Sequence, residues 1–494
     1  MIKIPFNNQY VHLGDQFYQE ALPTPVTEPV LIRFNDELAH SLGLSVCDAD
    51  RDGLAALFSG NKIPEGASPL AMAYSGHQFG HFSPQLGDGR AILLGEIGNN
   101  DSSLGIQLKG CGRTYFSRNG DGRAALGPVL REYLLSEAME KLNVPTTRAL
   151  AVVATGENVN RDRLLPGGVI TRIASSYVRV GTFQYFAARG DKGSVRQLAD
   201  YMIEHCYQEV AGSDQPYVAF FKAVIERQAS LIAKWMQLGF IHGVMNTDNM
   251  SIVGETIDYG PCAFMDAYSH QQVFSSIDQN GRYAYNNQPN IGLWNLMRLA
   301  ESILPLLADD SDEGIEIAQS LLKTYTYEYE QFWLSGMRQK CGLGAIESHD
   351  HDDKALIEWL LDIMHANHAD FTLTFRALSQ LKAKSSEYDD VIRNLFEKPA
   401  QFDEWVVKWR TRLLLESQND EQRQLSMQAA NPAYIPRNHQ IEAAIRAAED
   451  NDDYSVFNKL HEVLQNPFVQ QPGKESYQRP PAPEEIVHRT FCGT

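Results

Sequence analysis

The six cysteines of this 494-residue chain are scattered and include no Cys-x-x-Cys pair. Zinc sites and disulfide-rich secreted domains both need closely placed cysteines, so neither class is expected. No apolar run approaches the roughly 18 uncharged residues that a membrane-spanning helix needs. The first residues carry neither the apolar core of a signal peptide nor an Arg-rich amphipathic pattern. These absences predict a protein of the bacterial cytoplasm with no membrane partner.

Positive charge is also scarce, because 43 Lys and Arg residues face 62 Asp and Glu residues and give a formal net charge of −19. A nucleic-acid-binding surface needs a basic footprint, so nucleic acid is not expected as a partner. The arginines nevertheless gather near Gly-rich turns. Most of them are expected to be solvated at the surface, but their concentration also fits a polyanion such as a nucleoside triphosphate. The gathered residues are Arg113, Arg118, Arg123, Arg131, Arg148, Arg161, Arg163, Arg172 and Arg179.

A chain of this length can form two or three domains, or one two-lobed enzyme with extensions. Residues 1–70 are expected to be an extended N-terminal segment with one short helix near 37–42. Residues 71–190 are rich in glycine and in short apolar alternations, which predicts a mostly β unit. Residues 191–494 are expected to be mainly helical and to end in a tail after a Pro-rich stretch.

Individual elements follow from periodicity and turn residues. Strands are predicted at 91–97 and 104–108, a hairpin around Gly254, and a helix that begins at Pro128, a residue favoured in the first helical turn. The other predicted helices cover 217–238, 294–304, 313–334, 355–378 and 440–464.

The segment HGVMNTDNM begins at His242 and is followed by DYG, which begins at Asp258. The catalytic loop of protein kinases has the pattern His-x-Asp-x-x-x-x-Asn, with a later Asp-Phe-Gly, and it supplies a base and two metal ligands. His242, Asn249 and Asp258 stand at matching positions, but Val244 stands where the base is expected. Valine cannot accept a proton, so the loop is predicted to hold a metal-nucleotide without the usual base.

The residues of this motif can be assigned roles as metal ligands, base and structural support. Asn249 and Asp258 offer the hard oxygen ligands that Mg²⁺ or Mn²⁺ prefers. Asp248 is the only carboxylate inside the loop, so it is the candidate base, although an Asp beside a turn often serves only as a cap. His242 is expected to orient the loop.

Lys109 ends the strand GIQLK, which is similar to the kinase strand whose lysine holds nucleotide phosphates and pairs with a helix glutamate. A strand-terminal lysine taken alone is usually only solvated. The helix predicted downstream, however, offers Glu132, Glu137 and Glu140 as partners. Glu132 is the first choice and Glu137 the second, and the phase of the helix does not decide between them.

Two Gly-Asp-Gly-Arg turns, at 87–90 and 120–123, bracket Lys109. Glycine lets backbone amides approach a phosphate closely, and Arg90 adds positive charge. One such turn usually means only a tight bend. Two of them around a candidate nucleotide lysine favour a phosphate-binding role.

With these motifs on the page, the chain resembles the selenoprotein O (YdiU) family, kinase-fold pseudokinases that act as protein adenylyltransferases. The resemblance runs from about residue 10 to the C-terminus. Its motifs lie at 75–80 (SGHQFG), 86–90 (LGDGR), 107–110 (QLKG), 113–118 (RTYFSR), 131–134 (REYL), 145–150 (PTTRAL), 242–250 (HGVMNTDNM) and 258–261 (DYGP).

The resemblance implies an α+β protein with a protein kinase-like two-lobed fold and N- and C-terminal extensions. It implies that ATP binds in a reversed orientation, so that AMP is transferred to Ser, Thr or Tyr hydroxyls of partner proteins, with UMP from UTP as a family-level variant. Asp248 would be the base, Asn249 and Asp258 would hold Mg²⁺ or Mn²⁺, and Glu132 would orient Lys109. The implied ATP-binding residues are Gly87, Gly89, Arg90, Lys109, Asp121, Gly122, Arg172, Arg179 and Asp258.

Two rival functions remain open from the residues alone. An atypical phosphotransferase is disfavoured by Val244, and a non-catalytic nucleotide-binding scaffold is disfavoured by the metal ligands and Lys109. Some members of the family carry selenocysteine near the C-terminus, and some have a redox-active disulfide. Here Cys492 stands in the tail, but segment 272–276 has no cysteine to pair with it, which argues against a regulatory disulfide.

Overall fold

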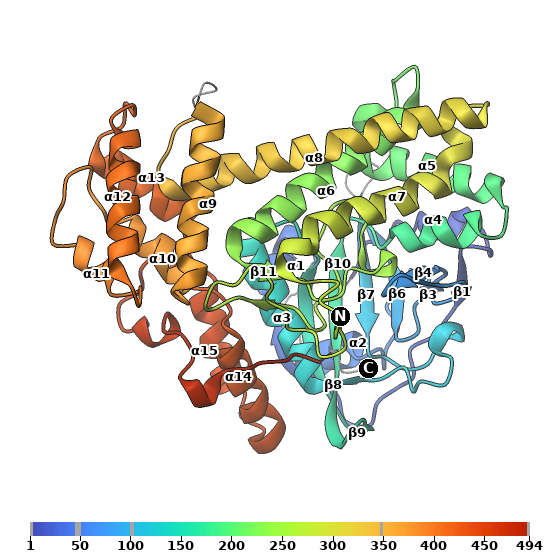
Figure 1. Cartoon of the computed structure of the whole chain (residues 1–494). Helices are drawn as coiled ribbons and strands as arrows, with labels where there is room; N and C mark the ends of the chain where they lie inside the picture. The colour runs from blue at the N-terminus through green and yellow to red at the C-terminus, as the bar shows by residue number, and fades with distance from the viewer. Residues whose placement is uncertain (1–2, 45–50, 99–102, 346–348, 492–494) are drawn as a thin grey trace.

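The computed structural model describes residues 3–44, 51–98, 103–345 and 349–491. Its centre is an eight-stranded sheet in the order β1-β3-β6-β7-β10-β9-β2, with β8 beside β10 (Figure 1). All of its strand pairs are antiparallel. The strands are β1 (Tyr18–Glu20), β2 (Val30–Phe34), β3 (Leu70–Met72), β6 (Ala91–Ile97), β7 (Leu104–Lys109), β8 (Ala124–Ala125), β9 (Arg148–Asn160) and β10 (Leu164–Ala174).

The sheet is buried on both faces, because alternate residues of a strand point to opposite sides. Val152 pairs with Ile170, and both lie in the apolar cluster that contains helix α3 (Leu126–Lys141). Their neighbours, the pair Val153 and Val169, belong instead to the cluster that contains helix α2 (Arg51–Phe58). This double burial explains why the sequence of these strands is almost continuously apolar.

Three long helices, α6 (Pro216–Leu238), α7 (Gln288–Leu307) and α8 (Ser311–Cys341), pack against one another beside the sheet (Figure 1). Helix α6 has proline in its first turn and ends at Gly239, whose φ of 69° is left-handed. Proline early and glycine late are the usual helix boundary residues. The end of α6 fixes where the next segment, the predicted catalytic loop, begins.

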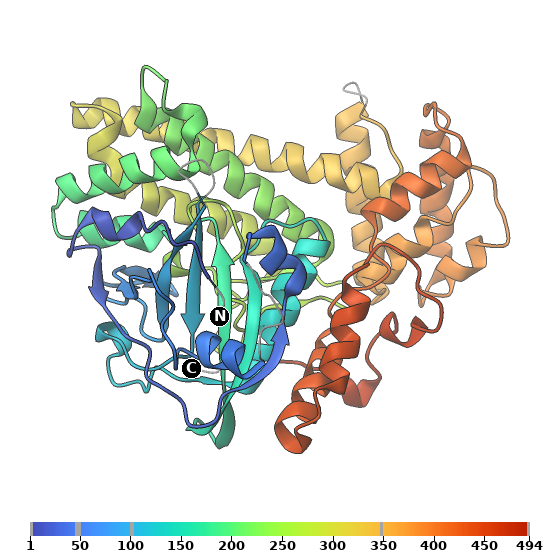
Figure 2. The same ribbon diagram turned by 180° about the vertical axis from the view of Figure 1, so that it is seen from behind.

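The C-terminal helices form a second helical group, at the far end of α8 (Figure 2). Helices α14 and α15 turn back and pack on α3. The final stretch reaches further, since the Thr490 backbone N donates to the Phe274 carbonyl at 2.8 Å and the Thr490 hydroxyl donates to the Pro261 carbonyl at 2.5 Å. The helices of this group are α9 (Asp350–Ala366), α10 (Phe371–Leu378), α11 (Asp389–Arg393), α12 (Pro399–Leu413), α13 (Asp420–Ala430), α14 (Asn438–Asn451) and α15 (Ser455–Leu464).

The mixture of helices and an antiparallel sheet confirms the predicted α+β class. The strands predicted at 91–97 and 104–108 and the helix predicted at 217–238 are confirmed. The helix expected to start at Pro128 begins two residues earlier, at Leu126. Segment 1–70 is richer than predicted, since it holds strands β1 and β2, the start of β3 and helix α2 besides the expected short helix α1 (Asp36–Ser41).

Three other predicted elements are wrong. Segments 250–253 and 256–257 do not form a hairpin around Gly254, because Ser251 pairs with Arg179 and Thr256 pairs with Thr146. The helix predicted over 355–378 is two helices, since His368 between them has a φ of 50°. The helix predicted over 440–464 is likewise interrupted, by a left-handed residue at 452. Periodicity continued across both breaks and concealed them.

Two further predictions concern membrane-spanning helices and the C-terminal cysteine. Among the described helices, none is both long and apolar enough to cross a membrane. Cys492, like Cys47, lies outside the described residues.

Candidate active site

Asp258 is the meeting point of three cationic side chains. Its carboxylate accepts a hydrogen bond from Arg172 at 2.6 Å and lies 3.4 Å from Lys109 Nζ and 3.1 Å from Arg179 Nη1. Lys109 is the last residue of β7, Arg172 lies on the neighbouring strand β10, and Arg179 precedes helix α4 (Val180–Ala187). The antiparallel register of β7 and β10 thus brings together residues far apart in the sequence.

Glu132 on α3 forms the other side of this cluster. Lys109 Nζ donates to Glu132 at 2.8 Å, and the guanidinium of Arg172 binds the same carboxylate. Glu137, the second choice for this partner, is occupied elsewhere, because it accepts hydrogen bonds from Arg148 at 2.8 and 2.9 Å. The structure therefore pairs Lys109 with Glu132, the first choice, and not with Glu137.

The cluster is buried yet keeps its carboxylates ionised. Burial by itself raises the pKa of Asp258, but Arg172, then Arg179 and Lys109, outweigh it and hold that pKa well below its usual range. Burial likewise opposes ionisation of Glu132, but Arg172 and Lys109 lower its pKa. Removal of one member of such a buried network is strongly destabilising, because it leaves an uncompensated charge.

Asp258 also has an unusual backbone, with a φ of 63°. This left-handed region is uncommon for residues other than glycine, and such strain gathers at functional sites where the surroundings fix it. Here the three cations hold the side chain while the backbone turns sharply. Asp258 is thus fixed in position by its neighbours.

The loop before Asp258 is supported by His242. Its Nε2 donates to the Ile257 carbonyl at 2.9 Å, and its Nδ1 accepts from the Val244 backbone N at 3.4 Å. Burial lowers the pKa of this histidine, in agreement with a neutral ring that donates on one side and accepts on the other. His242 therefore binds the loop to the segment that carries Asp258, as expected for a structural histidine.

Val244, at the position where the kinase pattern has its base, orients the side chain of Asn249. Val244 is 6% exposed and lies in the main apolar core. Its carbonyl accepts a hydrogen bond from Asn249 Nδ2 at 3.1 Å. This bond leaves Asn249 Oδ1 as the atom of that side chain that can bind a cation.

Asp248, in the short 3-10 helix Thr247–Asn249, points to the hairpin of β4 (Gly76–Gln78) and β5 (His81–Ser83). Gln78 Nε2 donates to Asp248 Oδ2 at 3.4 Å, while Oδ1 is buried and has no hydrogen-bond partner among the described residues. Burial raises the pKa of Asp248 to about 6. A buried carboxylate with an unpartnered oxygen and a pKa close to neutrality is well suited to accept a proton.

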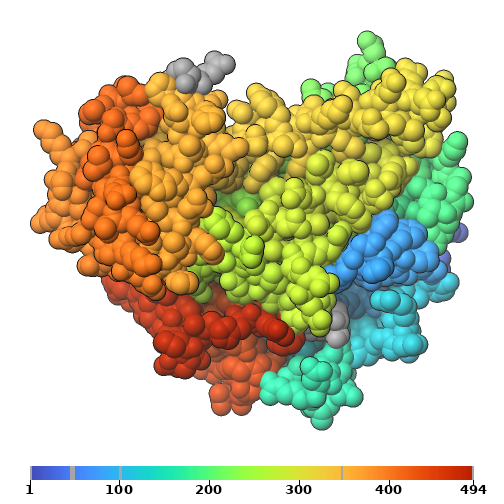
Figure 3. Space-filling view, in the orientation of Figure 1, coloured from blue at the N-terminus to red at the C-terminus, as the bar shows by residue number. Residues whose placement is uncertain are grey.

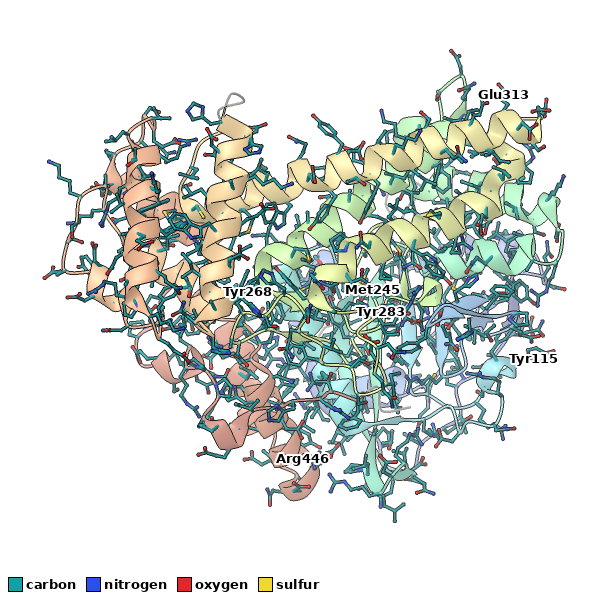
Figure 4. All side chains as sticks on the ribbon, in the orientation of Figure 1. Tyr115, Met245, Tyr268, Tyr283, Glu313 and Arg446 are labelled. Carbon is teal, nitrogen blue, oxygen red and sulfur yellow. The ribbon has the colours of Figure 1, made fainter. Side chains whose placement is uncertain are left out.

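The same hairpin is fastened to the loop by backbone donors. The backbone N of His77 donates to the Thr247 hydroxyl at 2.7 Å, and the backbone N of Phe79 donates to Asn246 Oδ1 at 3.0 Å. Asn246 Oδ1 also accepts from the Tyr283 hydroxyl at 2.6 Å. Figure 4 labels Tyr283 and also Met245, the loop residue that precedes Asn246. Asp248 is therefore held between two segments that are distant in sequence.

The first glycine turn is packed against protein. A β-carbon at Gly87 would lie 2.2 Å from the Phe116 ring, and one at Gly89 would lie 2.9 Å from the Phe116 carbonyl. The backbone N of Gly87 donates to the Tyr74 carbonyl at 3.1 Å. The glycines are thus required for this packing, and the amide of Gly87 is already used.

Asp88, between these glycines, is a site residue that the sequence reasoning did not assign. Its side chain is buried, lies 3.8 Å from Arg179 and accepts from Gln107 Nε2 at 3.3 Å. Arg179 in turn lies over the ring of Tyr74, 4.6 Å from its centroid. Two features of the sequence pointed to a site role for Asp88. It lies inside the motif LGDGR at 86–90, and its partner Gln107 is on the same strand face as Lys109.

The remaining candidates lie at different distances from the cluster. Arg90 adjoins it, since its carbonyl accepts from the Gly110 backbone N at 2.8 Å. Burial, then the charge of Arg172 and, less strongly, that of Arg90, lower the pKa of Lys109. Asp121 binds Arg161 at 2.8 Å on the surface, and none of its contacts in the described part of the chain reaches the cluster. A β-carbon at Gly122 would lie 2.1 Å from the Gly112 carbonyl, which gives this glycine a packing role.

The oxygen atoms at the site fit a hard cation. The Asp258 carboxylate and Asn249 Oδ1 are the kinds of ligand that Mg²⁺ or Mn²⁺ accepts. No group of three or more His, Cys, Asp or Glu suited to a metal occurs within the described ranges. This donor set suits an ion that takes further oxygens from phosphates.

These features fit an enzyme of the nucleotide-handling kind, since Lys109 is paired with Glu132, Asp258 lies among three cations, and the loop contains a buried carboxylate. Comparison with known proteins agrees. The family described as "Protein adenylyltransferase SelO" matches residues 1–465. The chain belongs to this family, as the resemblance predicted, and it is therefore an enzyme that transfers a nucleotide, AMP, to proteins.

Individual relatives support the assignment along the whole chain. "Protein nucleotidyltransferase YdiU" of Rhodopseudomonas palustris (strain BisB5) is 56% identical over 494 residues, which is all of both chains. The protein of the same name from Rhizobium johnstonii is 55% identical over 491 residues, 99% of this chain and 97% of the relative. That from Bradyrhizobium sp. (strain ORS 278) is 55% identical over the full length of both.

Proposed function

We propose that this adenylyltransferase moves AMP from ATP to the hydroxyl groups of Ser, Thr or Tyr side chains in other proteins, with Asp248 as the base. The observation that carries the proposal is the state of Asp248. It is buried, has an unpartnered Oδ1 and has a pKa raised to about 6, while Val244 at the usual base position is apolar.

The proposed arrangement is that of a protein kinase-like enzyme with two lobes. Residues 71–190 would form the lobe that contains the sheet and Lys109, and residues 191–494 the mainly helical lobe with its C-terminal extension. Residues 1–70 would be the N-terminal extension. The ion pair of Lys109 with Glu132, beside Asp258, supports this arrangement.

ATP would bind with its phosphates toward the buried cations. Arg172 and Arg179 would meet the terminal phosphates, and Lys109 would meet the phosphate nearer the transfer point, because guanidinium groups suit phosphate oxygens. Gly89 and Arg90 would line the entry beside them. Asp121 and Gly122, which lie outside the cluster of ion pairs, would shape the outer turn through Arg161 and Gly112.

Asn249 and Asp258 would hold Mg²⁺ or Mn²⁺ together with the phosphates. When bound, the ion would neutralise charge on the phosphates and on the departing group. Asp258 already lies among three cations, so the negative charge that a further cation needs would come from the nucleotide.

The transfer itself would proceed at the α-phosphorus. The acceptor hydroxyl oxygen forms a bond to this phosphorus, and the bond from it to the oxygen that bridges to the β-phosphorus breaks. Pyrophosphate leaves with that electron pair, and the hydroxyl proton passes to Asp248. A positioned general base typically contributes about 10²–10⁴-fold to such a rate.

The test is an incubation with a protein acceptor and ATP labelled at either the α- or the γ-phosphate. We expect label on protein from the α position alone, and loss of that label in Asp248→Asn. Label from the γ position would mean phosphotransfer, and label from neither would mean a nucleotide-binding scaffold. The same assay with α-labelled UTP tests uridylyl transfer as the variant reaction.

A further inference from the structure

A polar cavity of about 470 Å³ lies between segment 270–281 and the start of α7. The described residues that line it include no charged and no aromatic side chain. Its size falls in the range of small-ligand and peptide pockets, about 300–1,000 Å³. Besides one Gly and one Ala, its lining consists of primary amides, namely Gln271, Asn280, Asn286, Asn287 and Asn290.

Three of these amides have their hydrogen-bonding groups uncommitted. The side chains of Gln271, Asn280 and Asn286 are exposed and make no hydrogen bond within the part of the chain that the structure describes. The other two brace the wall, since Asn287 Nδ2 donates to the Arg282 carbonyl at 2.7 Å and Asn290 Nδ2 donates to Asn287 Oδ1 at 3.1 Å. The cavity thus presents both donors and acceptors from a fixed frame.

The frame is closed by backbone hydrogen bonds. Tyr285 N donates to the Gln272 carbonyl at 3.0 Å, and Asn286 N donates to the His270 carbonyl at 3.0 Å. Asp278 accepts from the backbone N of Tyr283 at 2.8 Å. Segment 270–286 is therefore a folded loop whose ends are joined.

This loop is connected to the segment that carries the proposed base. The Tyr283 hydroxyl donates to Asn246 Oδ1 at 2.6 Å, and Asn246 lies two residues before Asp248. In Figure 3 the yellow-green surface that includes this loop lies beside the blue surface of the β4–β5 hairpin, which also touches Asp248. Tyr283 lies between Gly281 and Ala284, which line the cavity, so the segment that lines the cavity also binds the catalytic loop.

The lining chemistry selects the occupant. A nucleotide needs cationic groups, and these lie in the cluster around Asp258 instead. A sugar ring usually stacks on an aromatic side chain, which the described lining lacks. A primary amide offers two donors and an acceptor, which matches the N–H and C=O of an extended peptide backbone. Such pairing is independent of side-chain sequence.

We propose that this amide-lined cavity binds the acceptor protein, through the backbone of an extended segment next to the hydroxyl that receives AMP. The inference rests on the proposed function and extends it to the acceptor. The enzyme would then select acceptor proteins that expose an extended segment, and the side-chain sequence of that segment would matter less.

The test uses the full chain, α-labelled ATP and an equimolar library of nine-residue peptides with a fixed central Ser. The variant Gln271→Ala/Asn280→Ala/Asn286→Ala should lower kcat/KM for the library at least tenfold, since each lost hydrogen bond weakens binding several-fold. ATP affinity, measured by calorimetry, should stay unchanged. A matched control is Gln319→Ala/Gln331→Ala/Gln339→Ala, three exposed amides on α8.

A second library with N-methylated backbone amides beside the Ser removes backbone donors and leaves side chains alone. The wild type should use it at least tenfold less well, and the triple cavity variant should show little further loss. Equal kcat/KM of wild type and cavity variant for the first library would overturn the proposal, as would equal loss in the control variant.

A photoreactive benzoylphenylalanine at the peptide N-terminus gives a readout that needs no catalysis. Cross-links should map to segment 270–290, and cross-links confined to other segments would contradict the proposal. If the wild type labels no peptide from α-labelled ATP, the proposed function fails for peptides, while the cross-linking map still decides whether the cavity binds them.

Discussion

Gly76 leaves no room for a side chain beside Asp248, because a β-carbon built on Gly76 would lie 2.4 Å from Asp248 Oδ1. The absence of a side chain at one position therefore sets the place of the carboxylate at another. Gly76 lies in a strand and is not among the residues with a positive φ, so its backbone would accept alanine, and the three atoms nearest to the added β-carbon all belong to Asp248.

We predict that Gly76→Ala displaces the base and lowers the transfer rate roughly 10²–10⁴-fold, the usual contribution of a general base. ATP affinity should change little, because the cluster around Asp258 is untouched. The control is Gly212→Ala, since a β-carbon there meets no atom within 4 Å. A Gly76→Ala enzyme with wild-type turnover would show that Asp248 need not occupy this place.

Asp248→Asn should lower the transfer rate by the same order and leave ATP affinity nearly intact, because it removes a proton acceptor without changing shape. The measurement compares kcat and ATP dissociation constants with one acceptor and one metal throughout. Loss of nucleotide affinity in proportion to rate would instead make Asp248 a metal ligand or a structural cap.

The raised pKa of Asp248 also predicts a gain in stability for the same variant. The folded state, with a pKa of about 6, holds the proton more tightly than the unfolded chain, whose value is 3.8. Stability is therefore lost as pH rises from about 4 to 6 and stays lower above that. In metal-free, nucleotide-free protein, Asp248→Asn should unfold at a higher temperature than wild type at pH 8, by up to about 3 kcal/mol in free energy. The difference should shrink toward zero near pH 4.

Metal binding is expected to require the nucleotide. Asp258 is already neutralised by Lys109, Arg172 and Arg179, so Mg²⁺ alone should give no calorimetric binding signal, whereas Mg²⁺ with a non-hydrolysable ATP analogue should. Asp258→Ala should abolish transfer, and Asn249→Ala, which removes a neutral ligand, should be milder. Full turnover of Asp258→Ala at saturating Mg²⁺ and Mn²⁺ would refute its assignment.

The two buried arginines should distinguish ATP from AMP. Arg172→Ala and Arg179→Ala are each expected to weaken ATP far more than AMP, which lacks the terminal phosphates. Arg172→Ala should also destabilise the fold by about 3–5 kcal/mol, because it leaves Glu132 and Asp258 partly unpaired. Equal losses of affinity for both nucleotides would contradict the reversed orientation.

The sequence predicted best where a single local rule governs the structure. Alternation placed strands β6 and β7, and the apolar period of 3.6 placed α6. The loop pattern selected His242, and the structure shows its ring bonded to the Asp258 segment. Local rules failed where the backbone pairs with distant partners, as Ser251 and Thr256 do with Arg179 and Thr146 in place of a hairpin.

The sequence predicted which residues form the site but not which of them pair with one another. Motifs indicated Lys109 and Asp258, but the choice between Glu132 and Glu137 depended on how α3 lies against β10, which helix phase alone does not fix. Asp88 was overlooked because a carboxylate between two glycines reads as a turn residue. Its burial beside Arg179 is a tertiary fact.

The burial of Val244 opposes a functional carboxylate at this position. A carboxylate at position 244 would restore the base of the kinase pattern. It would lie in the apolar core, next to the backbone carbonyl of residue 244 that accepts a hydrogen bond from Asn249. An unpaired buried charge is costly and takes up a proton instead of ionising. An aspartate at position 244 would therefore be held in its protonated form and could not act as the base unless the surrounding core also changed.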